Sequence, residues 1–316
     1  MSSETVQALG VLHEMALAMG DHSTAAWAAR HQQAMLAAFH QWWISSQHLY
    51  ADSLCEGTEG DCTHAGQQLQ QRWWTTVAPM EQGIAPVTNA DAALAGMEGP
   101  TFSGTCGLFV DGVGGPSGTG GQTCYLVNSG AMARAEANYG RTAQAVSYMG
   151  KVAGQLTVEM PGSLPELAAS AQYDPFEPFT SRANVMQAWS SYGVMWTVVN
   201  DLLGVTPDVP QGSVAVVPEV PASWPSLSVS HLRVGSQDLA VTASHQAGSY
   251  RTQVSGAAGL SLTIGTVLPT GVKPTSVTLN GQQAHYKLVS TPRGTAVEVA
   301  VAAPAAQETL AVQTAG

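Results

Sequence analysis

Residues 5–42, TVQALGVLHEMALAMGDHSTAAWAARHQQAMLAAFHQW, set the fold class of the first part of the chain. Apolar and aromatic residues recur there every three or four positions, as on one face of an α-helix. The two series are Leu9, Leu12, Ala16 and Met19, and then Trp27, His31, Met35, Ala38 and Trp42. Gly20 ends the first helix, and Ser23 or Thr24 is expected to cap the second. The stretch predicts a helical hairpin.

Further helical segments follow along the chain. We expect them at about 70–82, 88–98, 126–139, 141–158 and 182–203. The connections at 44–68, 99–124 and 159–181 are longer than the roughly 12–15 residues usual in compact domains, and such connections are often functional. Seven helices with long loops predict stacked helical hairpins whose loops gather at one end.

The sequence changes character near residue 210. Residues 1–212 hold 18 acidic and 6 basic residues, whereas residues 213–316 hold 4 and 5. β-Branched or alternating runs follow the change, and Asn280-Gly281 is typical of a two-residue hairpin turn. The runs lie at 239–243, 250–254, 260–264, 276–279 and 296–301. We expect a helical domain over 1–210 and an antiparallel β-sandwich over 211–316.

Composition limits the partners. Hydrophobic residues make up 45% and charged residues 10% of the 316, which is typical of a soluble globular protein and not of a disordered chain. A net charge of -11 disfavours nucleic acid and anionic membranes, and no apolar run approaches the roughly 20 residues of a membrane span. We expect no nucleic acid, no membrane, no cofactor and no metal ion.

The four cysteines bear on the compartment. Cys55 and Cys62 flank one polar loop, and Cys106 and Cys124 flank another. Two local disulfides are expected, which points to an extracytoplasmic or secreted protein, although no signal peptide follows Met1. Free thiols, or a zinc site of Cys55, Cys62 and His64, are the alternatives.

Familiar catalytic motifs are missing, and carboxylates and aromatic residues remain. The glycine-rich run 114–121 has no lysine, no His-Glu-x-x-His pair occurs, and no serine lies in a Gly-x-Ser-x-Gly turn. Glu166, by contrast, lies in a loop that Pro161 and Pro165 restrict. Trp189 and Tyr192 follow three residues apart and could form one aromatic wall for a sugar ring.

Several blocks resemble one family. They are EMPGSLPE at 159–166, YDPF at 173–176, MQAWSSYGVMW at 186–196, LYADSL at 49–54, QRWWTTVAPME at 71–81 and NSGAMARAEANYG at 128–140. In order and spacing, over residues 3–210, they resemble the six-hairpin glycosidases, and most closely bacterial proteins similar to the amylo-α-1,6-glucosidase part of glycogen-debranching enzymes.

The resemblance implies an (α/α)6 toroid and an inverting glycoside hydrolase acting on an α-glucan or related oligosaccharide. By position, Glu166 resembles the general base. Glu4 resembles a substrate-side residue at the start of an inner helix, and Trp73, Tyr173, Gln187 and Trp189 resemble residues of the sugar subsite.

The resemblance covers only part of a toroid. A full toroid has twelve helices against the seven expected here, and the family's general acid would lie upstream of Met1. We therefore expect an incomplete toroid, a chain that begins inside a longer parent, and an exposed apolar face that leads to self-association or to pairing with a missing N-terminal portion. A non-catalytic carbohydrate-binding or structural protein, and an open helical solenoid, are the other interpretations.

Overall fold

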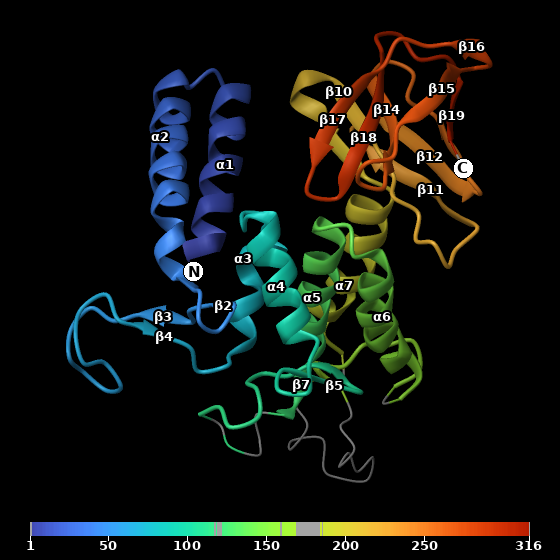
Figure 1. Ribbon diagram of the computed structural model, residues 1–316. Coiled ribbons are helices and arrows are strands. Elements are labelled where there is room, and N and C mark those ends of the chain that lie inside the picture. Colours follow the sequence, from blue (N-terminus) through green and yellow to red (C-terminus); the bar gives the residue numbers. More distant parts are fainter. Residues whose placement is uncertain are drawn as a thin grey trace. The chain divides into compact units, whose positions relative to one another are not determined.

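The computed structural model describes residues 2–116, 118, 122–158, 160–168, 184 and 186–315. The chain divides into two compact units. The first comprises Met1–Tyr139 and Ser147–Val194, and the second comprises Gly140–Val146 and Met195–Gly316 (Figure 1). The boundary expected near residue 210 falls within a hairpin of the second unit, and the division of the chain at that residue stays a prediction.

Seven α-helices occur in the N-terminal part of the described residues, as the periodicity predicts. They are α1 Ser2–Ala18, α2 His22–Ala38, α3 Ala78–Glu81, α4 Val87–Met97, α5 Leu126–Asn138, α6 Thr142–Ala153 and α7 Tyr192–Trp196. Helix α5 is buried along most of its length, and α1 and α2 form an antiparallel hairpin (Figure 1). A closed toroid is not shown.

Some helix ends differ from those expected. Asp21 caps α2 in place of Ser23 or Thr24, because its carboxylate accepts hydrogen bonds from the Thr24 backbone N–H at 3.0 Å and from the Thr24 hydroxyl at 2.7 Å. The helix expected at 70–82 begins only at Trp74, since Arg72 has a positive φ of 68° and the residues before it pair as a strand.

Single-turn helices extend several of these elements. They are the 3₁₀-helices η1 Phe39–Trp42, η2 Trp74–Val77, η4 Gly154–Thr157, η6 Ala188–Ser191 and η8 Val209–Gln211, and the π-helix η7 Thr197–Leu202. The helices expected at 141–158 and 182–203 are therefore each broken into shorter pieces.

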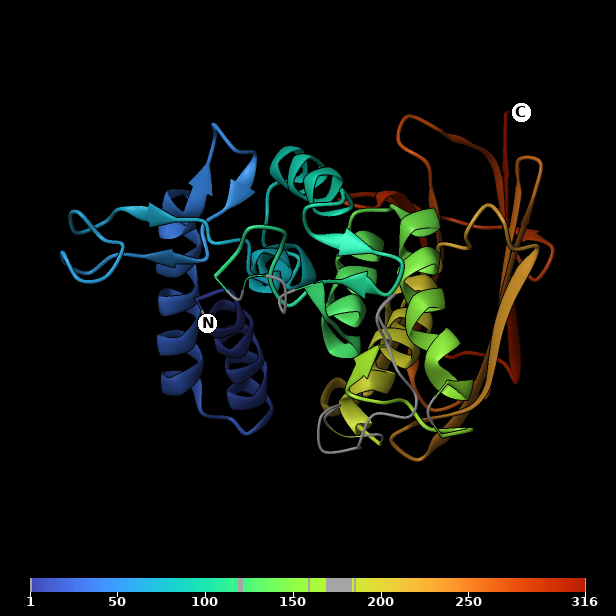
Figure 2. The ribbon, with the colours of Figure 1, turned by 90° about the horizontal axis from the view of Figure 1, so that it is seen from below.

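The long loops of the first unit form short antiparallel strand pairs. The strands are β1 Trp43–Ile44, β2 Leu49–Tyr50, β3 Ser53–Leu54, β4 Gln68–Leu69, β5 Ser103–Gly104, β6 Gly107–Leu108, β7 Cys124–Tyr125 and β8 Leu167–Ala168. Strands β5 and β7 lie at one end of α4, α5 and α6 (Figure 1), and Figure 2 shows that end from below.

Both expected disulfides are present, Cys55–Cys62 and Cys106–Cys124, with Cα–Cα distances of 5.7 and 5.9 Å. Because these thiols are bonded to each other, the alternatives of free cysteines and of a zinc site with His64 are wrong. The disulfides support an oxidising environment.

The second unit contains two β-sheets. Its strands are β9 Val205–Asp208, β10 Ser213–Val216, β11 Ser226–Val234, β12 Gln237–Gln246, β13 Ser249–Ser255, β14 Ser261–Leu268, β15 Pro274–Leu279, β16 Gln282–Gln283, β17 Lys287–Thr291, β18 Gly294–Val301 and β19 Gln307–Thr314. The orders are β17-β18-β14-β10-β9 and β11-β12-β13-β19-β15-β16. All pairs are antiparallel except β10–β14, in which Val214 lies opposite Leu262.

One hydrophobic core joins the two sheets. Alternate residues from both, such as Val216 and Ile264 from one and Val241 and Leu310 from the other, are almost fully buried in the same cluster. The expected hairpin turn is confirmed, because Asn280 and Gly281 have φ of 51° and 80° between β15 and β16. Burial of alternate positions explains why these strands could be expected from their sequence.

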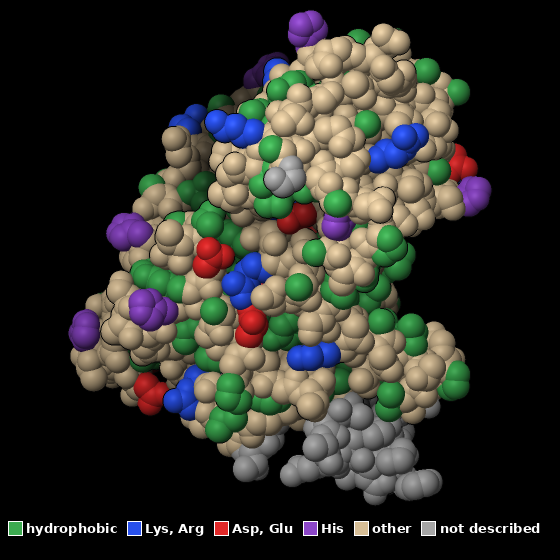
Figure 3. Space-filling model, turned by 45° about the vertical axis from the view of Figure 1, so that its right-hand side comes forward, with side chains coloured by type: hydrophobic (Ala, Val, Ile, Leu, Met, Phe, Trp, Pro, Cys, Tyr) green, Lys and Arg blue, Asp and Glu red, His purple; other side chains and the backbone are tan. Residues whose placement is uncertain are grey.

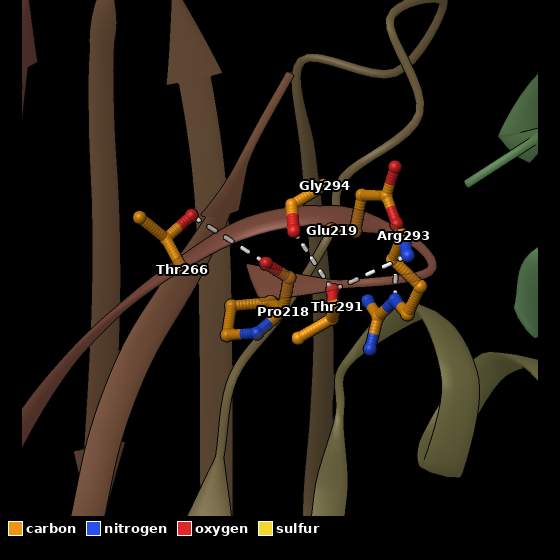
Figure 4. A network of polar contacts seen from close by, with 6 residues as sticks. All are labelled: Pro218, Glu219, Thr266, Thr291, Arg293 and Gly294. Carbon is orange, nitrogen blue, oxygen red and sulfur yellow. Dashed lines mark hydrogen bonds and ion pairs between the residues drawn. The ribbon is translucent and has the colours of Figure 1, made fainter. Parts of the chain in front are cut away.

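A polar network closes one edge of this unit (Figure 4). The Arg293 guanidinium Nε donates to the Glu219 carboxylate at 3.0 Å, and both side chains are less than one-fifth exposed. The Thr291 hydroxyl donates to the Gly294 carbonyl at 3.0 Å and accepts from the Arg293 backbone N–H at 3.2 Å. Thr266 donates to the Pro218 carbonyl at 3.4 Å. The network ties the β17–β18 turn to the segment that follows β10.

The α1–α2 hairpin exposes several large apolar side chains. On α1 they are Val11, Leu12, Met15 and Leu17, and on α2 they are Trp27 and Leu36. Met19, just beyond α1, is 83% exposed. No helix among the described residues is long and apolar enough to cross a membrane.

Candidate functional site

Four chain segments meet through backbone hydrogen bonds at the loop end of the first unit. Trp73 bridges to Asp111, Phe109 bridges to Cys124, and β7 pairs with β8 so that Cys124 lies opposite Ala168. The Cys106–Cys124 disulfide packs beneath these segments with Leu126 and Ala168. These contacts hold residues far apart in sequence together. We call the joined segments, at Trp73, 109–111, β7 and β8, the framework.

Glu166 lies in this framework, immediately before β8. Its backbone N–H donates to the Asn184 carbonyl at 2.8 Å, and its carbonyl accepts from the Leu126 N–H at 3.0 Å. Leu164 on one side and Ala168 on the other pack against the same core cluster. The backbone of Glu166 is therefore fixed from both sides, while its side chain stays partly exposed.

The Glu166 carboxylate receives two long hydrogen bonds. The Asn184 backbone N–H and side-chain Nδ2 donate to Oε2 at 3.3 and 3.4 Å. Both of these hydrogen bonds from Asn184 are accepted by Oε2.

Gln187 and Trp189 lie beside the Glu166 loop. The Gln187 backbone N–H donates to the Leu164 carbonyl at 2.9 Å, and the Ser190 hydroxyl donates to the Pro165 carbonyl at 2.7 Å. Trp189 is 48% exposed in η6, whereas Gln187 is partly buried. The structure therefore brings the segment 187–190 to the loop that carries Glu166.

The other expected site residues are more dispersed. Trp73 is partly exposed and joins the framework through its bridge to Asp111. Glu4 lies exposed in the first turn of α1, where its charge acts on Glu81. Tyr173 lies outside the described residues.

A partly buried polar network that the sequence did not reveal joins α3, α5 and the start of α7. The Arg134 guanidinium Nη1 donates to the Tyr192 hydroxyl at 2.7 Å, and that hydroxyl donates to Glu81 Oε1 at 2.7 Å. Tyr192 therefore belongs to this network, while Trp189 is exposed. Trp189 and Tyr192 were expected to form one aromatic wall. The contacts of Tyr192 with Arg134 and Glu81 do not support that expectation.

The protein environment raises the pKa values of two groups in this network, Glu81 and Tyr192. Burial raises the pKa of the Glu81 carboxyl above its ordinary value, although the hydrogen bond from Tyr192 and the charge of Arg134 oppose the change. Burial, and then the charge of Glu81, raise the pKa of the Tyr192 hydroxyl. Tyr192 therefore remains protonated and able to donate at neutral pH.

Two glycines bring α5 and α7 together. A Cβ atom added at Gly193 would lie 2.1 Å from the Gly130 Cα, and one added at Gly130 would lie 2.7 Å from the Gly193 Cα. The two helix backbones can come this close only because both residues are glycines, which have no Cβ atom. This approach lets Tyr192 reach Arg134 on α5, and the glycines were a signal available in the sequence.

A second carboxylate, Asp52, is held near η2. The Thr76 hydroxyl donates to Oδ1 at 2.7 Å, and the backbone N–H groups of Gln71 and Trp73 donate to Oδ2 at 2.5 and 3.4 Å. Burial raises the pKa of Asp52, and these hydrogen bonds oppose that change. Asp52 thereby fixes the start of the segment that carries Trp73.

No group of three or more His, Cys, Asp or Glu side chains among the described residues could hold a metal ion. On the face in Figure 3, charged side chains are few and scattered among uncharged ones.

Comparisons place the fold among parts of larger proteins. No protein-family model matches the chain, and no curated protein matches it in sequence. An α-L-rhamnosidase from Dictyoglumus thermophilum superposes with a TM-score of 0.57 at 11% identity, over 98% of this chain and 31% of that one. A GH78 rhamnosidase of Bacillus sp. GL1 gives a TM-score of 0.52 at 17% identity, over 77% and 23%. A sialidase gives 0.57 at 11%, over 76% and 23%.

The chain thus spans about a third or less of the length of these structures. At such identities the likeness concerns the fold alone. It supports a distant structural similarity to parts of glycoside hydrolases, and the closer resemblance to the glucosidase part of debranching enzymes stays a prediction.

Proposed function

We propose that the chain carries the general-base portion of an inverting glycoside hydrolase that acts on an α-glucan or related oligosaccharide. Residues 1–210 would form part of the toroid, and residues 211–316 an accessory sandwich. The observation that carries the proposal is the placement of Glu166. Its backbone is hydrogen-bonded to Asn184 and Leu126, and the nearby residues Leu164 and Ala168 pack against the core. Its side chain is partly exposed at the loop end of the first unit.

The proposed chemistry needs two carboxyl groups. Ionised Glu166 takes a proton from a water molecule, and the water oxygen bonds to the anomeric carbon as the glycosidic bond breaks. A general acid from a further part of the protein donates a proton to the leaving oxygen. Inverting enzymes hold the two carboxyls roughly 6.5–9.5 Å apart, because the water must fit between them.

The neighbouring residues supply binding contacts in this proposal. Trp189 is exposed enough to pack against the apolar face of a sugar ring, and Gln187 can hydrogen-bond its hydroxyl groups. Trp73 joins the same framework. Glu4 and Tyr173 complete the proposed substrate-binding set by their resemblance to family positions.

A comparison of Glu166→Gln with the unchanged sequence, both within a complete parent protein that supplies the general acid, tests the proposal. Calorimetry with malto-oligosaccharides measures binding, and a reducing-sugar assay measures hydrolysis. We expect Glu166→Gln to abolish hydrolysis and to retain binding, because glutamine keeps the shape but cannot accept the proton. Glu56→Gln, in the exposed Cys55–Cys62 loop, serves as the control. Hydrolysis by Glu166→Gln at the unchanged rate would refute the role of Glu166.

A non-catalytic carbohydrate-binding or structural protein is the second candidate. The engagement of Asp52 and Glu81 in hydrogen bonds within the protein favours it, since both carboxylates serve to position the chain. Binding of oligosaccharide without release of sugar by a complete parent protein that supplies the general-acid portion would support this candidate.

The exposed apolar side chains of α1 and α2 suggest where a partner packs. We place there either a second copy of the chain or further helices of a longer protein. The two disulfides agree with a protein that works outside the cytoplasm.

A further inference from the structure

A cavity of about 350 Å³ lies in the first unit, away from the residues that hold the Glu166 loop. The first turn of α1, η1, the segment from β2 to β3, and the η2–α3 segment line it. Its main side chains are those of Phe39, Trp42, Tyr50, Asp52, Ser53 and Thr75. The volume is within the range of about 300–1,000 Å³ that small-molecule sites have.

Three aromatic residues are among those that line this cavity. The rings of Phe39 and Trp42 are nearly parallel, with centroids 6.2 Å apart, and the Phe39 and Tyr50 centroids are 5.7 Å apart. Phe39 and Tyr50 are buried, which fixes them, while Trp42 remains partly exposed. A partly exposed indole backed by buried rings is a rigid apolar platform.

Polar groups also line the cavity, and the Asp52 carboxylate is held in place. The Asp52 carboxylate accepts from Thr76 and from the Gln71 and Trp73 backbone. Gln70 Nε2 in turn donates to the Thr76 hydroxyl at 2.9 Å and to the Tyr50 carbonyl at 2.7 Å. Asp52 therefore has a fixed orientation, and each carboxylate oxygen has more than one lone pair.

We propose that this cavity is a second carbohydrate-binding site that takes one pyranose unit, with its C–H face on Trp42 and its hydroxyl groups on Asp52, Ser53 and Thr75. The proposal rests on the proposed carbohydrate function but is independent of Glu166 and of hydrolysis. A pyranose ring matches the combination of one apolar platform with a carboxylate and hydroxyls.

A cationic ligand fits the same cavity less well. Quaternary ammonium groups are bound by several aromatic faces together. Here the cavity also contains the hydroxyl-bearing side chains of Ser53 and Thr75, which such a group cannot use. A polyhydroxylated neutral ligand is therefore the better match.

Two variants of the full chain test the site. Trp42→Ala removes the platform, and Thr75→Trp fills the cavity from an exposed position without removing a buried group. Trp27→Ala is the matched control, because Trp27 is an exposed tryptophan of α2 that does not line the cavity. Calorimetric titration with maltotriose and with methyl α-L-rhamnoside measures affinity, and circular dichroism verifies folding.

We expect Trp42→Ala and Thr75→Trp each to weaken binding at least tenfold, with Trp27→Ala unchanged. Unchanged affinity in Thr75→Trp would overturn the proposal, as would binding of tetramethylammonium without binding of either sugar. Comparison with Glu166→Gln separates the two proposals. If Glu166→Gln hydrolyses normally while Thr75→Trp loses binding, the proposed catalytic role fails and the second site stands. If Thr75→Trp binds normally while Glu166→Gln is inactive, the second site fails alone.

Discussion

Replacing Gly193 by alanine should separate α5 from α7. The added Cβ would lie 2.1 Å from the Gly130 Cα, 3.1 Å from its N and 3.2 Å from its carbonyl carbon. Ordinary contact begins near 3.4 Å, so the two backbones must move apart by about 1.3 Å. No side-chain rotation can relieve the clash, because every atom involved belongs to the backbone.

The magnitude follows from two effects. Overpacking of this kind costs about 3 kcal/mol, the upper part of the usual range, and the better helix propensity of alanine returns less than about 1 kcal/mol. A shift of α7 by about 1 Å would also stretch the 2.7 Å hydrogen bond from Tyr192 to Glu81 beyond useful length. We therefore expect a net loss of about 2–3 kcal/mol in the free energy of unfolding.

Urea unfolding followed by circular dichroism measures this loss. Gly150→Ala is the matched control, since Gly150 lies inside α6 with nothing within 4 Å of an added Cβ. That variant should gain about 0.5–1 kcal/mol. Equal stability of Gly193→Ala and the unchanged chain would refute the reasoning, because it would mean that the helices do not touch at these glycines.

Two further predictions concern buried charges. Burial raises the pKa of Glu81 in the folded protein above its ordinary value of 4.5. The contribution of Glu81 to stability is therefore greatest below that pH and declines as the pH rises. Glu81→Gln should remove this decline, which urea unfolding midpoints measured from pH 4 to 8 would show. A decline of equal slope in both proteins would contradict the assignment. In the second unit, Arg293→Ala should cost about 3 kcal/mol because it leaves the Glu219 carboxylate buried without its partner. The double variant with Glu219→Ala should cost less than the sum of the single changes, and strict additivity would argue against the ion pair.

Prediction of the fold succeeded where the signal was local. The helical period at residues 5–42 gave α1 and α2, and Asn280-Gly281 gave the β15–β16 turn. The prediction failed where contacts with another segment of the chain decide the local structure. Residues 70–73 were expected to begin a helix, but the helix begins only at Trp74, after the pairing of β4 with β3. Strands β11, β17 and β19 lie outside the runs that the sequence singled out.

Prediction of the site was less complete. Proline spacing singled out the Glu166 loop, and the structure shows that loop fixed by Asn184 and Leu126. The contact between Tyr192 and Glu81 spans 111 residues, and that between Arg134 and Tyr192 spans 58. No periodicity within one segment can indicate such pairs.

The sequence by itself indicated the two kinds of secondary structure and their order, and it favoured both disulfide pairs. Each of these depends on residues within one or two turns of chain, or on cysteines that flank a single loop. Only the tertiary structure decided which side chains share a site. Gly130 contacts Gly193, and Asp52 lines one cavity with Phe39 and Trp42, only when distant segments pack. Burial and close approach depend on what covers a residue as well as on its type.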